Sequence, residues 1–263
     1  MTKYFDVKKP LPKLGVVILS FLGILIFIIL WNLIAKFGNV KTIFLPTPTE
    51  TVYAIINLFQ YHGFLGEILL SLYRILLGFM ASLVLAFPLG LLLGSFDFFK
   101  NLMEPLVNFI RYIPPVAFIP LTILWFGIGD LQKGIVIFIS VFPYLLVLFI
   151  DVVARVPQEH IDTAKALGFS RTRTLLYVVL PYSLPGYLDA TRAMFGTAWT
   201  FIIVAEMIAA SQGVGFLIIQ SQRFIKTENI FAVIIIIGLI GLFSDLLFKW
   251  IYSKLFFWSD KAK

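Results

Sequence analysis

Six long apolar segments constrain the fold of this chain more than any other feature of its sequence. A helix needs about 20 mostly apolar residues to cross the hydrocarbon core of a bilayer. The segments of about this length are 14–35, 69–96, 105–126, 134–153, 184–210 and 230–257. Because backbone polar groups inside a bilayer must bond to one another, we expect six transmembrane helices. The first segment is too long, and lacks a small-residue cleavage site, to be a removable signal peptide.

The connections between these segments are short, which leaves no room for a separate soluble module. Hydrophobic residues make up 60% of the chain and charged residues only 13%, whereas soluble domains have about 45–50% apolar and about 25% charged residues. The sequence therefore predicts one all-α, polytopic transmembrane domain over residues 1–263 that contacts membrane lipid.

Several kinds of chemistry are excluded by the residues that the sequence lacks. The chain has no cysteine and only two histidines, His62 and His160. It therefore lacks the residues for a thiolate metal site, and almost lacks those for a histidine metal site or a Ser–His–Asp triad. A membrane-embedded enzyme would need clustered catalytic carboxylates or histidines, and the sequence shows no such cluster. We expect no catalytic residue, metal or cofactor. The net charge of +7 bears on membrane orientation, and we expect no nucleic-acid partner.

Lysine and arginine in the connections predict the orientation, because these residues are retained preferentially in cytoplasmic loops. With the N-terminus inside, the cytoplasmic segments hold most of these cations: Lys3, Lys8, Lys9, Lys13, Lys100, Arg155, Lys165, Arg171, Arg173, Lys249, Lys254, Lys261 and Lys263. The outer segments hold Lys36, Lys41, Lys133, Arg223 and Lys226. We therefore expect a multi-pass protein of the inner (plasma) membrane with both termini in the cytoplasm.

The cytoplasmic loop 154–182 contains a short amphipathic helix. Its apolar residues recur every third position and alternate with charged ones, as Ile161, Ala164 and Leu167 beside Glu159, Asp162 and Lys165. Pro157 suits a helix start and Gly168 a helix end, while Ser170 can cap a second helix leading to Pro181. Such a helix either docks into a partner or rests on the bilayer surface.

The same loop resembles the EAA motif of ABC importer permeases. Asp162-Thr163-Ala164, three residues, Gly168, nine residues and then 178–181 (Val-Val-Leu-Pro) follow its spacing, with Asp for Glu, Thr for the first Ala and Val for Ile. The resemblance implies a coupling helix that inserts into a cytoplasmic ATPase subunit. The coupling residues it implies are Glu159, Asp162, Thr163, Ala164, Leu167 and Gly168.

Other segments narrow the resemblance to the permeases for taurine, alkanesulfonates, nitrate and bicarbonate, over about residues 45–240. These are 45–48 (Leu-Pro-Thr-Pro), 71–74 (Ser-Leu-Tyr-Arg), 113–115 (Ile-Pro-Pro), 119–121 (Ile-Pro-Leu), 125–129 (Trp-Phe-Gly-Ile-Gly) and 205–210 (Ala-Glu-Met-Ile-Ala-Ala). The resemblance implies the type I ABC importer permease fold. It also implies ATPase subunits that hold ATP and Mg²⁺, an extracytoplasmic binding protein and a second permease copy, in a homodimer.

The sequence limits the energy source, and the resemblance indicates the class of substrate. No G-x-x-x-x-G-K-[ST] phosphate-binding loop occurs in the sequence, so energy must come from partner ATPases or an ion gradient. A small anion such as taurine, another sulfonate, nitrate or bicarbonate is the expected substrate. The alternatives are a neutral heterocycle, such as a riboflavin or thiamine-pyrimidine precursor, and a stand-alone secondary transporter. Six spans without an evident inverted repeat argue against the last.

Charged residues within the spans are the candidates for a translocation path, because such residues usually face a cavity or a partner. In the fifth span, Arg192, Gly196, Trp199, Ile203 and Glu206 fall on one helical stripe. Arg192 and Glu206 are about 21 Å apart along the axis, so they cannot pair within one helix. The stripe lines the path or a dimer interface, or else belongs to a structural hydrogen-bonded network.

For most of the other in-membrane residues, more than one interpretation is open. Arg74 lines the path, snorkels, or pairs with Glu67 or an outer loop, and Arg111 lines the path or lies near the inner surface. Asp245 and Lys249, four residues apart, should form a local ion pair. The prolines at 114, 115 and 120 indicate a discontinuous span or a kink, and 211–229 a re-entrant or interfacial helix near an outer gate.

Overall fold

The protein is described here from a computed structural model that covers residues 12–39, 41 and 43–257. Lys3, Lys8, Lys9, Lys261 and Lys263, which contribute to the predicted orientation, lie outside the described residues. Every regular element in the described part is helical. The elements are α1 (Lys13–Phe37), α2 (Pro48–Tyr61), α3 (Phe64–Ser95), α4 (Asp97–Tyr112), η2 (Pro115–Phe118), α5 (Ile119–Phe126), α6 (Asp130–Ala154), α7 (Gln158–Ala166), α8 (Arg171–Thr174), η3 (Leu175–Val179), α9 (Leu180–Ala209), α10 (Val214–Arg223) and α11 (Thr227–Leu255).

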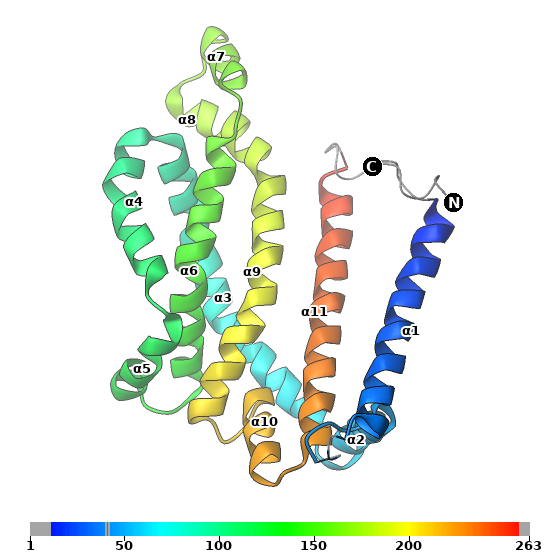
Figure 1. The fold of residues 1–263 in the computed structure, drawn as a ribbon. Coiled ribbons are helices and arrows are strands. Elements are labelled where there is room, and N and C mark those ends of the chain that lie inside the picture. Colours follow the sequence, from blue (N-terminus) through cyan, green and yellow to red (C-terminus); the bar gives the residue numbers. More distant parts are fainter. Residues whose placement is uncertain (1–11, 40, 42, 258–263) are drawn as a thin grey trace.

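The predicted spans correspond to long helices. Within the described residues, five helices are long and apolar enough to cross a membrane, and a bent pair makes up to six. Helices α1, α3, α6, α9 and α11 run between two ends of the molecule, with α7 at one end and α2, α5 and α10 at the other (Figure 1). The end with α7 is the predicted cytoplasmic end, and we call the opposite end the outer end.

The third predicted span is broken. Helix α4 and the η2–α5 segment meet at an angle of 83°, and Pro114 and Pro115 lie at the break. The predicted start at Pro105 was wrong, because α4 begins at Asp97 and Pro105 lies inside it. Hydropathy excluded this first part because it carries Asp97, Lys100 and Glu104, which an amphipathic helix tolerates on its polar face.

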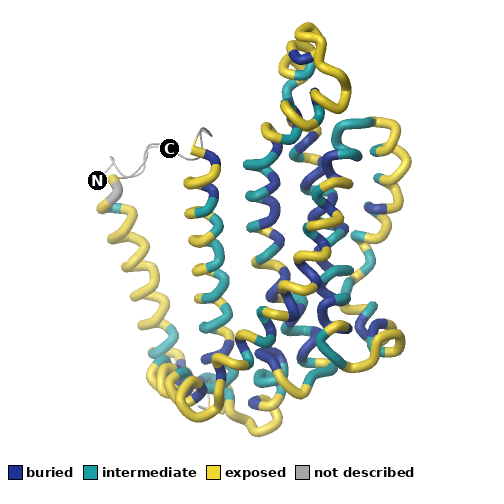
Figure 2. The backbone as a smooth tube through the Cα atoms, turned by 180° about the vertical axis from the view of Figure 1, so that it is seen from behind, coloured by how far each residue is buried: buried dark blue, intermediate teal, exposed yellow. Residues whose placement is uncertain are grey.

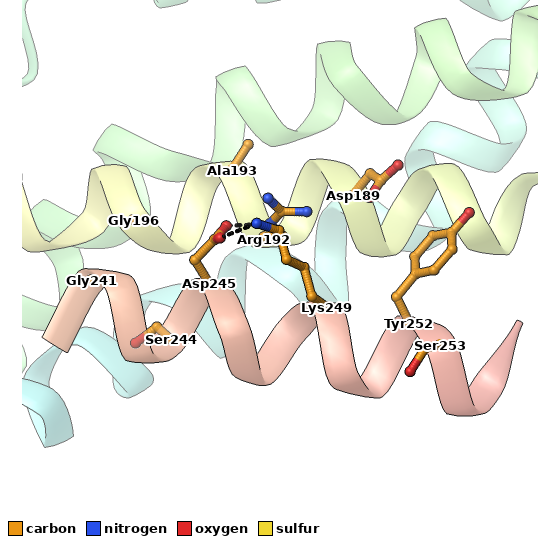
Figure 3. Close-up of a pocket in the computed structure, with 10 residues that line it drawn as sticks. All are labelled: Asp189, Arg192, Ala193, Gly196, Gly241, Ser244, Asp245, Lys249, Tyr252 and Ser253. Atoms are coloured by element: carbon orange, nitrogen blue, oxygen red, sulfur yellow. Dashed lines mark hydrogen bonds and ion pairs between the residues drawn. The ribbon is translucent and has the colours of Figure 1, made fainter. Parts of the chain in front are cut away.

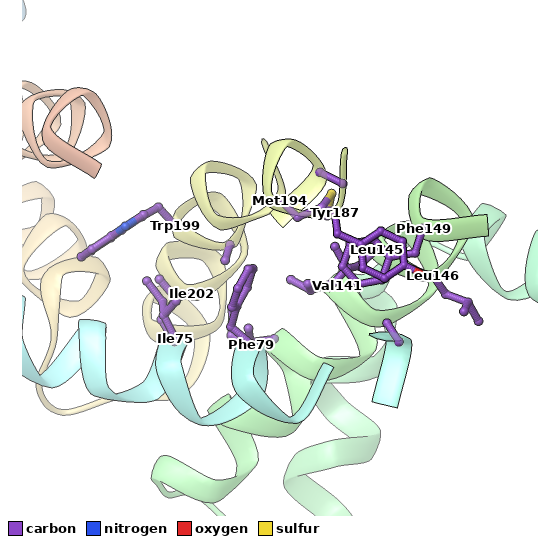
Figure 4. Packing of buried hydrophobic residues seen from close by; sticks show 14 of the residues in the cluster. Ile75, Phe79, Val141, Leu145, Leu146, Phe149, Tyr187, Met194, Trp199 and Ile202 are labelled. Atoms are coloured by element: carbon purple, nitrogen blue, oxygen red, sulfur yellow. The ribbon is translucent and has the colours of Figure 1, made fainter. Parts of the chain in front are cut away.

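Three helices form the centre of the molecule, with α6 packed against α3 and α9. Figure 4 shows the aromatic and aliphatic side chains that fill the space between them. The ring of Phe149 in α6 stacks on that of Tyr187 in α9 with centroids 3.9 Å apart, and Phe79 of α3 meets Phe195 of α9 edge to face at 5.2 Å. These contacts fix the relative positions of the three helices.

Two long helices, α11 and α1, lie on one side of this centre (Figure 1). Helix α1 is exposed along nearly its whole length (Figure 2), and Trp31 near its end donates a hydrogen bond to the Pro46 carbonyl oxygen at 2.9 Å. Helix α11 contacts α2, α10 and α9, and the ring of Phe248 in α11 lies 5.6 Å from that of Phe195 in α9.

The helix predicted to end at Pro181 instead continues into the fifth span. Helix α8, the π-helical segment η3 and α9 form one helical stretch from Arg171 to Ala209. Inside an α-helix, a proline ring clashes with the carbonyl four residues earlier. The wider π turn just before Pro181, in which Leu180 donates to the Leu175 oxygen, relieves this conflict. Ser170 caps the stretch as expected, since its hydroxyl accepts from Arg173 N at 3.4 Å.

Candidate functional site

A cavity of about 880 Å³ lies between α9 and α11, and we call it the α9–α11 groove. Figure 3 shows its lining from the two helices: Asp189, Arg192, Ala193, Gly196, Gly241, Ser244, Asp245, Lys249, Tyr252 and Ser253. A Cβ atom on Gly196 or Gly241 would have no atom within 4 Å, so both glycines border open space.

An ion-paired cluster of three residues crosses this groove. Arg192 Nε donates to Asp245 Oδ1 at 2.5 Å, and Lys249 Nζ lies 2.8 Å from the other oxygen, Asp245 Oδ2. The pair between Asp245 and Lys249 confirms the sequence prediction. Arg192 pairs with a residue of another helix, and not with Glu206, which the helical spacing had excluded as its direct partner. One carboxylate therefore satisfies two cations, each of which is partly exposed to the groove.

The predicted stripe on α9 divides into two parts. Arg192 and Gly196 line the groove, whereas Trp199 and Glu206 are buried away from it among the central helices. The indole N–H of Trp199 is buried with no hydrogen-bond partner among the described residues. Arg74 and Arg111 also lie outside the groove lining.

Arg74 is buried at the outer end and bridges several elements. Its Nη1 donates to Glu206 Oε1 of α9 at 2.7 Å and to the Gln212 carbonyl oxygen at 2.8 Å. Its Nε donates to Asp130 Oδ1 at the start of α6 at 2.7 Å. Of the two structural partners anticipated from the sequence, an outer connection is confirmed by these contacts, whereas Glu67 accepts from the backbone N–H of Gly213. We call these side chains, with Ser71, the outer network.

Ser71 links Glu206 to the short helix α10. Its hydroxyl donates to the Glu206 carboxylate, with Oε1 at 2.8 Å and Oε2 at 2.9 Å, and accepts from Val214 N at 2.9 Å. Glu206 Oε2 also accepts from Gly215 N at 2.9 Å. The start of α10, in the segment expected to be re-entrant or interfacial, is thus held by side chains of α3 and α9.

Arg111 lies next to the break after α4. Its Nε is buried with no hydrogen-bond partner among the described residues, and its guanidinium lies 5.3 Å from the centre of the Tyr112 ring. Its carbonyl oxygen accepts from the Tyr144 hydroxyl of α6 at 2.9 Å. On the other side of the break, Gln132 of α6 donates to Thr122 of α5 at 2.8 Å, so α6 fixes both parts of the broken span.

The predicted coupling helix is α7, at the tip of the cytoplasmic end. It ends in a Schellman motif, with Gly168 N bonded to Lys165 O at 2.9 Å and Phe169 N to Ala164 O at 3.0 Å. Gly168 has a φ of +79°, a conformation that favours glycine. The predicted start at Pro157 is the N-cap, one residue before the helix.

The apolar stripe of α7 is divided between this chain and solvent. Ala164 is buried and Ile161 packs against the core, whereas Leu167 is 72% exposed. The exposed surface also carries Glu159, Asp162 and Thr163. The pKa of Asp162 is lowered by hydrogen bonds from Gln158 at 2.9 Å and Lys165 at 3.2 Å. Asp162 is therefore ionised at neutral pH.

Sequence reasoning missed two members of the outer network. Asp130 follows Gly129 and precedes an apolar run, which marks it as a lone acid at the start of a span. Ser71 lies one turn before Arg74, so one helical face carries both. Among the described residues, no three His, Asp or Glu side chains form a group that could hold a metal ion.

Comparisons with known proteins identify the family. The profile described as binding-protein-dependent transport system inner membrane component matches residues 86–256. The taurine transport system permease protein of Escherichia coli is 29% identical, over 94% of this chain and 92% of its own length. The bicarbonate transport system permease protein of Synechococcus elongatus is 28% identical, over 93% of this chain and 91% of its own length.

The fold agrees with a solved transporter. A chain from inward-facing conformations of the MetNI methionine ABC transporter superposes with a TM-score of 0.66 and 17% identity, over 72% of this chain and 94% of that chain. The protein therefore belongs to the family of binding-protein-dependent transport system inner membrane components, as the multi-pass permease subunit of an ABC importer whose ATPase activity lies in partner subunits.

Proposed function

We propose that two copies of this permease form the translocation path for a small anion, such as taurine, another sulfonate, nitrate or bicarbonate. The observation that carries this proposal is the similarity, over more than nine-tenths of the chain, to permeases named for taurine and for bicarbonate transport. Each of those compounds carries an anionic oxygen group. The family supplies the energy source, which removes the need for a stand-alone secondary transporter.

The α9–α11 groove supports a path role for Arg192. Arg192 and Lys249 share the carboxylate of Asp245, so an entering anion can replace one of these bonds without leaving a charge unpaired. Asp189 also lines the groove, and the formal charges of the lining residues balance. A path must bind its substrate weakly enough to release it, and a balanced groove meets this condition, with selection left to the binding protein.

The exposed faces of the chain support a homodimer. Charged residues inside a bilayer are costly when they face lipid, yet Arg192 and Asp245 each expose about a third of their side chain in the single chain. Gly196 borders open space on the same side. A second copy placed against α9 and α11 would enclose the groove and remove these groups from lipid.

Helix α7 supports coupling to the ATPase subunits. It projects from the cytoplasmic end (Figure 1) and presents Leu167 beside Glu159 and Thr163. ATP-driven closure of the ATPase pair would move α7. The rest of the loop is continuous with α9 through α8 and η3, so the movement would reach one wall of the groove and alternate its access.

The test is uptake into vesicles that contain the permease, its ATPase subunits and its binding protein. We expect ATP-dependent accumulation of taurine, another sulfonate, nitrate or bicarbonate, with the other anions as competitors. Vesicles with a hydrolysis-deficient ATPase subunit are the control. ATP-dependent uptake of a neutral heterocycle, without competition from any of these anions, would overturn the substrate class while leaving the family assignment unchanged.

A further inference from the structure

The outer network joins four elements at one buried point, and it does so away from the α9–α11 groove. We infer that Arg74 and Glu206 are positioning residues that keep α10 docked on α3 and α9 throughout transport. In this arrangement α10 moves together with α3 and α9 during transport. The outer gate therefore opens beside α10, and α10 does not separate from α3 and α9. This inference rests on the proposed function for its reference to transport, but the docking itself can be measured separately.

The start of α10 depends on side chains from other helices. The first N–H groups of a helix have no partner within it. Here the N–H groups of three consecutive residues, 213–215, are bonded to Glu67, Ser71 and Glu206 respectively. The carboxylates of Glu67 and Glu206 also suit the positive end of the helix dipole. Loss of Glu206 would therefore leave α10 without its acceptor from α9.

Two glycines allow Glu206 to approach α10 this closely. A Cβ atom on Gly213 would overlap the carboxylate of Glu206, and Gly213 has a φ of +112°. A Cβ atom on Gly215 would overlap the Ile203 carbonyl oxygen and would lie 2.7 Å from Glu206 Cβ. The two glycines and the carboxylate form a close-fitting contact that a displaced α10 could not keep.

The hydrogen bonds of Arg74 can all form only when α10 is docked on α3 and α9. Its guanidinium bonds to Glu206, Asp130 and the Gln212 carbonyl oxygen at once, which connects α3 to α6, to α9 and to the turn before α10. Lys133 is a second buried cation nearby, with Nζ 3.2 Å from the Gly129 oxygen. A buried charge that loses its partner is strongly unfavourable, so movement of α10 alone would break several bonds together.

The chain has no cysteine, so a single introduced thiol can report docking. Ser221 is a buried residue of α10, seven positions after Val214 and hence on the same helical face. Gln222, its neighbour, is exposed. We would label Ser221→Cys and, as the matched control, Gln222→Cys with a membrane-impermeant maleimide from outside. The assembled complex would be compared without nucleotide and after trapping with vanadate and binding protein.

We expect Ser221→Cys to stay protected in both states and Gln222→Cys to react in both. Adding Glu206→Gln should speed labelling of Ser221→Cys at least about tenfold, which corresponds to about 1.4 kcal/mol of docking free energy. Adding Arg74→Gln alone should have a similar effect. The pair Arg74→Gln with Glu206→Gln should label more slowly than either single change, because neither member of the Arg74–Glu206 ion pair is then left as a buried charge without the other.

The ratio of ATP hydrolysed to substrate transported is a second measurement. General destabilisation of the permease would lower both quantities and leave this ratio unchanged. The Glu206→Gln complex, adjusted to equal amounts of folded protein, should hydrolyse more ATP per substrate molecule transported. If that variant fails to assemble, Ser71→Ala removes only the hydroxyl between Glu206 and Val214 and should raise labelling to a smaller extent. The inference would be overturned if Ser221→Cys, with the outer network unchanged, were labelled in the trapped complex as fast as Gln222→Cys. It would also be overturned if neither Glu206→Gln nor Ser71→Ala changed the labelling rate of Ser221→Cys. These results are independent of which substrate is transported.

Discussion

Gly78 of α3 faces Gly134 of α6 so closely that a Cβ atom on Gly78 would overlap the Gly134 carbonyl oxygen. Small residues allow helix backbones in a membrane to approach in this way. Further along the same face, a Cβ atom on Gly90 would lie 2.5 Å from Phe149 Cβ, and one on Gly94 would lie 2.6 Å from Val153 Cβ. The contact between α3 and α6 thus depends on small residues along one face of α3.

Replacing Gly78 should loosen this central contact. Overpacking a close interface costs about 1–3 kcal/mol, so Gly78→Val should lower the thermal unfolding temperature of the detergent-solubilised permease. Gly66→Val, in the same helix where a Cβ atom meets nothing within 4 Å, is the matched control. Equal unfolding temperatures for the two variants would contradict the close approach of α3 and α6.

Changing the end of α7 should disturb coupling to the ATPase. Gly168→Val places a β-branched residue at a φ of +79°, where an L-residue costs about 1–2 kcal/mol. It should therefore reorient the exposed Leu167 and reduce co-purification of the ATPase subunits. Gly168→Asn is the control, because asparagine tolerates this conformation. Full recruitment and normal uptake in both Gly168→Val and Leu167→Asp would refute the docking role of α7.

Asp245→Asn should change transport kinetics rather than folding. Its ion pairs are partly exposed, and such pairs contribute about 0–1 kcal/mol to stability. The substitution removes the carboxylate that Arg192 and Lys249 share, so a transported anion should be held longer, with lower KM and lower maximal rate. Ser253→Ala, in the same groove lining, serves as a neutral control. An unchanged KM for a sulfonate, for nitrate and for bicarbonate would contradict a role of Asp245 in the path.

A cysteine at Gly196 should trap the homodimer. Gly196 borders open space beside the groove, and the cysteine-free chain makes any cross-link specific. Oxidation of Gly196→Cys in the assembled complex should give a covalent dimer on a denaturing gel. Leu124→Cys, at a 79% exposed residue of α5 that lies far from α11 (Figure 1), should not. Monomer alone from Gly196→Cys, under conditions where the complex is intact, would argue against α9 at the interface.

The spans were predictable because the thickness of a bilayer sets both their length and their hydropathy. The first span, predicted as 14–35, is α1 from Lys13 to Phe37, and the fourth, predicted as 134–153, is α6 from Asp130 to Ala154. Hydropathy could not place the first turns of α4, whose charged residues lie on one side of an amphipathic helix. The three prolines indicated a discontinuous span or a kink, and the angle of 83° between the two parts shows a broken span.

The pairing of the charged residues was less predictable, because it depends on the rotation of helices distant in the sequence. Spacing within one helix was sufficient for Asp245 and Lys249, which do pair. Arg74 and Glu206 are separated by 132 positions, and no local pattern relates the facing sides of α3 and α9. The regular spacing of small residues at 78, 82, 86, 90 and 94 was an available signal for the side of α3 that meets α6.

The isolation of α1 has a consequence for how freely its sequence can change. From residue 14 to residue 30 its side chains are partly or fully exposed, and none packs into the centre formed by α3, α6 and α9. Within one chain, substitutions there are constrained by apolar character and length, not by the shape of neighbouring side chains. Between residues 14 and 30, one aliphatic or aromatic residue can therefore replace another during evolution without a compensating change in the helical centre, whereas Trp31, which stacks on Phe231 at 5.8 Å, cannot be exchanged so freely.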